Sequence, residues 1–181
     1  MFIQTQVTPN PATLKFLPGQ DVAPSTFEFK SRAESSNSPL AQRLFGITGV
    51  ENVFLGKDFV SVSKASNTDW SMLKPMILAA LMEHFSTGQP IVLNATKEQD
   101  NSEDSAIVTQ IKELIETRVR PAVMMDGGDI VFDSFDNGVV YLRMRGACAG
   151  CPSSTMTLKS GIENMLRHYV PEVTEVRPVA D

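Results

Sequence analysis

Two cysteines, Cys148 and Cys151, are the residues of this chain with the clearest potential for chemistry. They are the only cysteines among 181 residues, they form a CxxC pair, and a proline follows directly in the segment GACAGCP. Such a pair supplies two thiolates, whereas zinc and the common iron–sulfur clusters each take about four protein ligands. The pair must therefore share a metal with ligands from elsewhere, form a disulfide, or act in redox chemistry.

The elements around the pair are expected to present it at a junction between a strand and a helix. Gly146 and Gly150 let the backbone approach a bulky ligand closely. Pro152 suits the first turn of a helix, and a helix N-terminus stabilises thiolates through its unpaired N–H groups and partial positive charge. Arg143 and Arg145 precede the pair. They either offset negative charge on a thiolate cluster or are ordinary solvated strand residues.

Three alternatives to a cluster stay open. A thioredoxin-like dithiol–disulfide oxidoreductase also carries CxxC between a strand and a helix, but its fold needs more elements than residues 152–181 can supply. Structural zinc needs two further ligands. His84 and His168 are expected to be surface or boundary residues, which leaves only zinc shared between two chains. A structural disulfide would close a very small loop and constrain the chain little.

An iron–sulfur cluster bridging two protomers satisfies the ligand number best. Two thiolates from each of two symmetric loops can hold a [2Fe–2S] or a [4Fe–4S] centre. A cluster held across an interface is exposed, and it is released when the interface parts. These properties are those of a carrier or scaffold, so we expect a homodimer without turnover chemistry of its own.

Composition narrows the class of protein further. The net charge is −5, with 16 basic against 21 acidic residues, which disfavours a nucleic-acid partner. The longest apolar run, residues 76–82, is far shorter than the roughly 20 residues that span a bilayer. The N-terminus resembles neither a secretory signal nor a transit peptide. We therefore expect a soluble intracellular protein with no membrane partner, cytoplasmic in a bacterium or, as a processed form, in the mitochondrial matrix.

Pattern and punctuation predict two small domains. In the first half, helices are expected over 38–45 and from 69–73 to Gly88. One face of the second carries Leu73, Ile77, Ala80, Leu81 and Phe85. Pro75 suggests a late start or a kink in that helix. The expected strands of this half are 2–6, 13–17, 26–30, 50–55 and 59–63.

The second half follows an acidic, polar stretch that is expected to be a flexible linker, residues 89–104 in our division. The pattern of apolar residues after this linker predicts the order α-β-β-α-β. The elements are a helix through Ile107–Val119, strands at 130–135 and 139–143, a helix from Pro152, and a strand at 172–177. Asn137-Gly138 predicts a hairpin between the first two strands. Met156, Ile162, Met165, Leu166 and Tyr169 are expected to face the core.

Both halves resemble one known family. The segment from Arg120-Pro121 through Asp126–Asp129 (DGGD), followed by GACAGCPSS, is similar to the C-terminal domain of NifU, the core of the Nfu-type iron–sulfur proteins. FIQT, TPNP, LKF and Pro18-Gly19 in the first half are similar to the Nfu N-terminal domain. The resemblance covers nearly the whole chain apart from the linker.

The resemblance implies an α+β protein of two small α/β-mixed domains. Residues 1–88 would serve partner recognition or stability, and residues 105–181 would bind the cluster. Cys148 and Cys151 of two subunits would hold a [4Fe–4S] cluster, received from upstream assembly proteins and delivered to apo iron–sulfur client proteins. The role of Asp126–Asp129 does not follow from residue chemistry: it either shapes the loop beside the cluster or is a tight turn, and we favour the turn.

Overall fold

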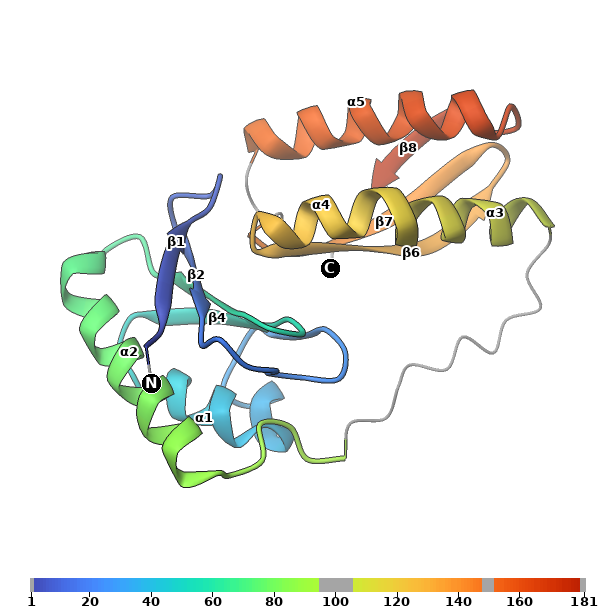
Figure 1. The fold of residues 1–181 in the computed structure, drawn as a ribbon. Helices are drawn as coiled ribbons and strands as arrows, with labels where there is room; N and C mark the ends of the chain where they lie inside the picture. The colour runs from blue at the N-terminus through green and yellow to red at the C-terminus, as the bar shows by residue number, and fades with distance from the viewer. Residues whose placement is uncertain (1, 95–105, 148–151, 180–181) are drawn as a thin grey trace. The chain divides into compact units, whose positions relative to one another are not determined.

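The structure is a computed structural model that describes residues 2–94, 106–147 and 152–179, with side chains from residue 159 onward in the last range. It divides the chain into two compact units, Met1–Glu98 and Gln99–Asp181. Each unit combines helices with its own β-sheet (Figure 1). The predicted α+β class with two domains is confirmed.

The first unit is a five-stranded antiparallel sheet with helices on one face. Its strand order is β1-β2-β5-β4-β3, and Figure 1 shows α1 and α2 on the same side of it. Side chains of alternate strand residues, such as Phe16, Val53 and Val62, pack with these helices into one core. The elements are β1 (Gln4–Val7), β2 (Thr13–Leu17), β3 (Phe27–Phe29), a 3₁₀ turn (Glu34–Asn37), α1 (Pro39–Phe45), β4 (Val50–Leu55), β5 (Val60–Lys64) and α2 (Trp70–Thr87).

Helix α1 begins where the sequence predicts. The Ser38 hydroxyl accepts a hydrogen bond from the Ala41 N–H at 3.1 Å and donates one to the Ile91 carbonyl at 2.7 Å. The first bond caps the helix, and the second ties the segment after α2 back to the unit. Leu93 adds a backbone bond to the Asn37 carbonyl at 2.6 Å. The chain is thus fixed to the first unit up to residue 93.

Helix α2 begins at Trp70, within the predicted range of 69–73. Asp69 caps it by accepting the Ser71 N–H at 2.8 Å, and Pro75 lies inside the helix, so of the two possibilities that Pro75 suggested the late start is not found. Hydrogen bonds from the backbone and the side chain of Ser71 hold the pKa of the exposed Asp69 carboxyl below its ordinary value. Of the predicted face, Leu73, Ile77 and Leu81 are buried, and Ala80 and Phe85 are partly buried against the same core. Gly88, at φ 66°, ends the helix in the left-handed conformation that glycine adopts readily.

The second unit has the predicted order of elements. Antiparallel β6 and β7 turn at Asn137 and Gly138, whose φ of 47° and 82° match the tight hairpin that this dipeptide predicts. Strand β8 pairs parallel to β7 after the crossover helix α5. The elements are α3 (Ala106–Leu114), a π-helical turn (Ile115–Val119), α4 (Arg120–Met125), β6 (Gly128–Asp136), β7 (Val139–Gly146), α5 (Pro152–Tyr169) and β8 (Glu175–Pro178).

The core of this unit corrects one predicted side chain. Ile162, Leu166 and Val170 are buried at helical spacing on α5, whereas Tyr169 is 42% exposed. Tyr169 lies off that stripe, and its ring instead packs beside the guanidinium of Arg118 at 5.0 Å. Met156 lies outside the described side chains. Among the described residues, no helix is both long and apolar enough to cross a bilayer.

Candidate functional site

Cys148 and Cys151 themselves lie outside the described residues, but both ends of the segment that carries them are described. Strand β7 ends at Gly146, and helix α5 begins at Pro152. The helix extends 18 residues, so its first turn has the unpaired N–H groups and partial positive charge of a helix N-terminus. The geometry at these two ends decides how the segment can be held.

The strand end is held against the loop that follows α4. Gly146 lies opposite Gly128 in the β6–β7 ladder and has φ 63°, a left-handed conformation that costs other residues about 1–2 kcal/mol. Ala147 is 2% exposed, and its N–H donates to the Gly127 carbonyl at 3.3 Å. Gly127 is itself left-handed at φ 80°. The residues just before the cysteine pair are therefore fixed by backbone contacts between two glycine-containing segments.

The Asp126–Asp129 loop does more than turn the chain. The side chain of Asp129 is fully buried and accepts hydrogen bonds from Arg120 and from the backbone of Ile130. Arg120 donates to both of its oxygens, from Nε to Oδ1 at 2.9 Å and from Nη2 to Oδ2 at 2.8 Å, and the Ile130 N–H donates to Oδ1 at 2.9 Å. A bidentate arginine–carboxylate pair is strong and directional. It connects the helix before the loop to the strand after it.

Arg120 is charged under all ordinary conditions. Burial of its guanidinium opposes the charge, but the hydrogen bonds and negative charges of Asp129 and Glu116 outweigh burial and raise the pKa of Arg120. The Glu116 contact, at 2.6 Å from Nη1, involves a carboxylate that is 60% exposed. The buried Asp129 pair is thus the structural contact, and Glu116 is a peripheral one.

A π-helical turn precedes Arg120 in the chain. The N–H of Arg120 bonds to the Ile115 carbonyl, five residues back, instead of the usual four. Pro121 follows, has no N–H to give to Thr117, and would crowd that carbonyl in a regular helix. The turn is a local solution to this proline, and the residue after it carries the guanidinium that binds Asp129.

The two arginines of β7 differ in their surroundings. Arg143 donates from Nε to Asp133 Oδ1 at 2.7 Å, so its charge is paired on the surface of the sheet. Arg145 is half-buried and lies opposite Asp129 in the β6–β7 register. Of the two, Arg145 is the nearer in the chain to the cysteine pair.

The histidines differ from each other and from expectation. His168 is exposed at the end of α5, as predicted. His84 is fully buried in the first unit, so the expected surface or boundary position is wrong; helical spacing places it beside Leu81 on the buried face of α2. Within the ranges that the structure describes, no three side chains of the His, Cys, Asp or Glu type gather closely enough to hold a metal ion.

Comparison with known proteins identifies relatives along the whole chain. Residues 3–88 match the family model "Scaffold protein Nfu/NifU N terminal", and residues 111–177 match the "NifU-like domain". Two curated relatives are each named NFU1 iron-sulfur cluster scaffold homolog, mitochondrial. The one from Drosophila willistoni is 50% identical over 186 residues, which is all of this chain and 64% of that protein. The human one is 49% identical over 185 residues, which is all of this chain and 73% of that protein.

The chain therefore spans a little under two thirds of the length of the Drosophila relative. Among solved structures, a NifU-like protein from Saccharomyces cerevisiae has a TM-score of 0.47 at 29% identity, over 53% of this chain and 87% of that one.

Proposed function

The chain belongs to the Nfu/NifU family, and on that basis we propose that it is an iron–sulfur cluster scaffold and carrier that binds a [4Fe–4S] cluster between two subunits. Cys148 and Cys151 of each subunit supply the four thiolates. The observation that carries the proposal is the single CxxC pair of the whole sequence, placed between the end of β7 and the start of α5. A [2Fe–2S] cluster would use the same four ligands.

The described residues support this assignment through what they do at the ends of the cysteine segment. The Arg120–Asp129 pair and the Ala147–Gly127 bond fix the strand end. At the other end, the first turn of α5 offers N–H groups and partial positive charge to nearby thiolates. Two thiolates held between fixed ends would lose less conformational freedom on binding, which favours capture of a cluster.

Delivery follows from where the ligands come from. Two subunits each contribute half of the ligand set, so separating them halves the coordination and releases the cluster to an apo-protein. The proposed partners are therefore a second copy of the chain, upstream cluster assembly proteins and apo iron–sulfur clients. The protein acts as a carrier rather than as an enzyme.

The division of labour between the units is part of the proposal. Residues 105–181 bind the cluster, and residues 1–88 serve partner recognition or stability. Of the linker predicted at 89–104, Ile91 and Leu93 bond to the first unit, so we place the link between the units after residue 93. A chain that lacks residues 1–88 should keep its cluster but transfer it more slowly to an apo-protein acceptor. Loss of cluster binding by that shortened chain would contradict this division.

The relatives' names also bear on location. Both describe mitochondrial proteins, which favours the mitochondrial matrix over the bacterial cytoplasm for this chain. Fractionation of the source cells, with the protein followed by antibody, distinguishes the two compartments.

The test of the proposal is single substitution of each ligand. Cys148→Ala or Cys151→Ala removes two of four ligands from every dimer and should abolish stable cluster binding, measured as iron and sulfide per chain after anaerobic reconstitution. Near-normal iron content in either variant would refute the assignment. Metal-free reduction of a disulfide substrate by the unmodified chain, lost in both variants, would favour the thioredoxin-like alternative.

A further inference from the structure

The first unit leaves one edge of its sheet open. β1 is the outer strand, next to β2, with an uninterrupted register from Gln4 to Val7. Proteins usually protect such an edge with lysine, proline or a bulge, because its unpaired backbone groups otherwise accept a further strand. The sequence of β1, QTQV, has none of these protections, and Val7 is 87% exposed.

The register shows which backbone groups face outward. Ala12 and Lys64 are a hydrogen-bonded pair between the flanks of β2 and β5, with the Lys64 N–H donating at 2.8 Å. Bonding direction alternates along an antiparallel strand, so the alternation can be carried through β2 to β1. It directs the N–H and C=O of Thr5 and Val7 away from β2. These are the groups that an added strand would bind.

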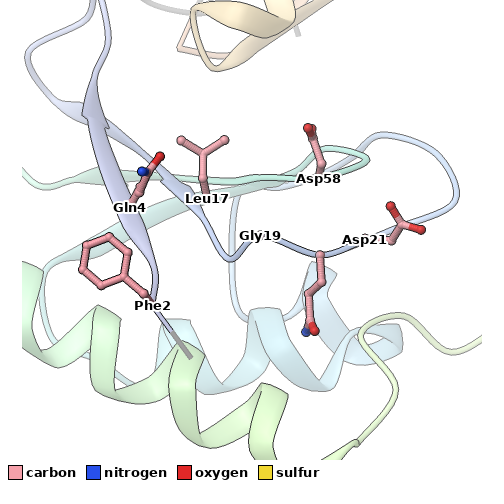
Figure 2. A pocket seen from close by; sticks show the side chains of 7 residues that line it. Phe2, Gln4, Leu17, Gly19, Asp21 and Asp58 are labelled. Carbon is pink, nitrogen blue, oxygen red and sulfur yellow. The ribbon is translucent and has the colours of Figure 1, made fainter.

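A hollow lies beside this edge, at the end of the sheet. Its volume is about 500 Å³, and all of its lining residues belong to the first unit. Figure 2 shows Gln4, Leu17 and Asp58 pointing to the side of the sheet away from α1 and α2. The residues that line the hollow are Phe2, Gln4, Leu17, Gly19, Gln20, Asp21 and Asp58.

The chemistry of the hollow selects an occupant. Phe2, which is 80% exposed, and Leu17 provide apolar contact, while Asp21 and Asp58 provide two carboxylates. Neither carboxylate forms an ion pair or hydrogen bond with another residue that the structure describes. The ammonium of Lys15, a cation on the same sheet, lies over the Phe59 ring, 4.5 Å from its centre, and forms no described ion pair with either carboxylate. An arginine or lysine side chain has the apolar stem and the cationic end that this lining complements.

We propose that the open edge of β1 and the adjoining hollow bind an extended segment of a partner protein, which pairs with β1 and places a basic side chain between Phe2 and the carboxylates of Asp21 and Asp58. Backbone pairing would supply affinity, and the hollow would supply specificity, as in other cases of strand addition. The inference does not depend on the cysteine pair. It gives the first unit a specific means of partner recognition.

The test uses the full chain and the peptide acetyl-Thr-Val-Thr-Arg-Thr-Val-Thr-amide. We expect binding, with NMR shift changes confined to β1 and the residues of the hollow. Val7→Pro removes an outward N–H without touching the β1–β2 ladder, and it should weaken binding about fivefold, whereas the matched control Val7→Thr keeps that donor and should bind normally. Replacing arginine by citrulline in the peptide, or Asp21 and Asp58 by asparagine, should each weaken binding about threefold to tenfold.

Other results would overturn the proposal. These are absence of peptide binding, equal binding by the proline and threonine variants, or equal binding of the citrulline peptide. Dimerisation of the chain through β1, abolished by Val7→Pro, would show a second copy as the occupant and also overturn it. Cluster content per chain is measured in parallel. It should be unchanged in all these variants, which separates a failure here from a failure of the cluster assignment.

Discussion

Replacing Asp129 by asparagine tests whether the buried ion pair supports the cysteine-bearing unit. Asparagine keeps the shape and one acceptor oxygen, so the bonds to Oδ1 from Arg120 Nε and the Ile130 N–H can survive. The second bond from Arg120, from Nη2 to Oδ2 at 2.8 Å, is lost, because the asparagine NH₂ group and Nη2 are both donors and would face each other. Hydrogen bonds to charged groups contribute about 1.5–3 kcal/mol each.

The expected loss is smaller than for a completely buried pair. Breaking such a pair costs about 3–5 kcal/mol, but the side chain of Arg120 is 23% exposed and retains Glu116 as a partner. We therefore expect Asp129→Asn to lower the free energy of unfolding of the second unit by about 2 kcal/mol. For a domain of this size, that corresponds to a fall in Tm of roughly 8–16 °C.

The assay can follow the units separately. Trp70 is the only tryptophan of the chain and lies in the first unit, whereas both tyrosines lie in the second. In calorimetry combined with tryptophan fluorescence, the Asp129→Asn change should shift the transition of the second unit and leave the tryptophan transition in place. Glu116→Gln is the matched control. It removes only an exposed contact and should cost less than about 0.5 kcal/mol.

Two results would refute this reasoning. One is an Asp129→Asn variant no less stable than Glu116→Gln, which would mean that the buried pair contributes nothing beyond its surface contact. The other is an equal shift of the tryptophan transition, which would mean that the two units do not unfold separately.

Two further predictions concern a buried histidine and two glycines. Burial of His84 and the charge of Arg43 lower the pKa of His84, while the carbonyls of Pro90 and Gln89 oppose this shift without forming hydrogen bonds. The folded state therefore holds His84 neutral, and the first unit should lose stability as pH falls below about 6.5, the pKa of histidine in the unfolded chain. His84→Leu should remove that dependence in urea unfolding followed by tryptophan fluorescence; an unchanged pH profile would contradict the cause. Gly146→Ala should lower the free energy of unfolding by about 1 kcal/mol, because Gly146 has a positive φ. Gly161→Ala, in an open helical position, should raise it by about 0.5–1 kcal/mol. Equal effects of the two changes in chemical unfolding would refute this account.

Local signals in the sequence predicted the elements well where one residue decides the conformation. Ser38-Pro39 marked the start of α1, Asn137-Gly138 marked the β6–β7 hairpin, and Gly88 marked the end of α2. In each case a cap, a positive φ or a fixed φ acts within a few residues. Such effects depend little on the rest of the fold.

The sequence was least informative where contacts between residues far apart in the chain determine the local structure. Pro75 is accommodated inside α2 because the Asp69 cap and the buried face together outweigh the single hydrogen bond that proline removes. His84 is buried because it lies on the same face of α2 as Leu81. The pattern of apolar residues alone did not include a histidine in that face.

The cysteine site shows the same contrast. The cysteine pair is visible in the sequence because both proposed ligands lie in one short motif. The buried pair of Arg120 and Asp129 joins a helix to a strand across a loop, and neither residue stands out by type. Both residues lie in segments that carry the family resemblance, but the only chemical signal of their pairing was an acidic residue directly before the apolar run 130–132 of β6.

The central claim, a cluster shared between two subunits, is tested most directly by native mass spectrometry after anaerobic reconstitution with iron and sulfide. We predict a species with the mass of two chains plus four irons and four sulfides, absent from the Cys148→Ala variant. A single chain with a complete cluster, or a metal-free chain two protons lighter, would contradict the claim.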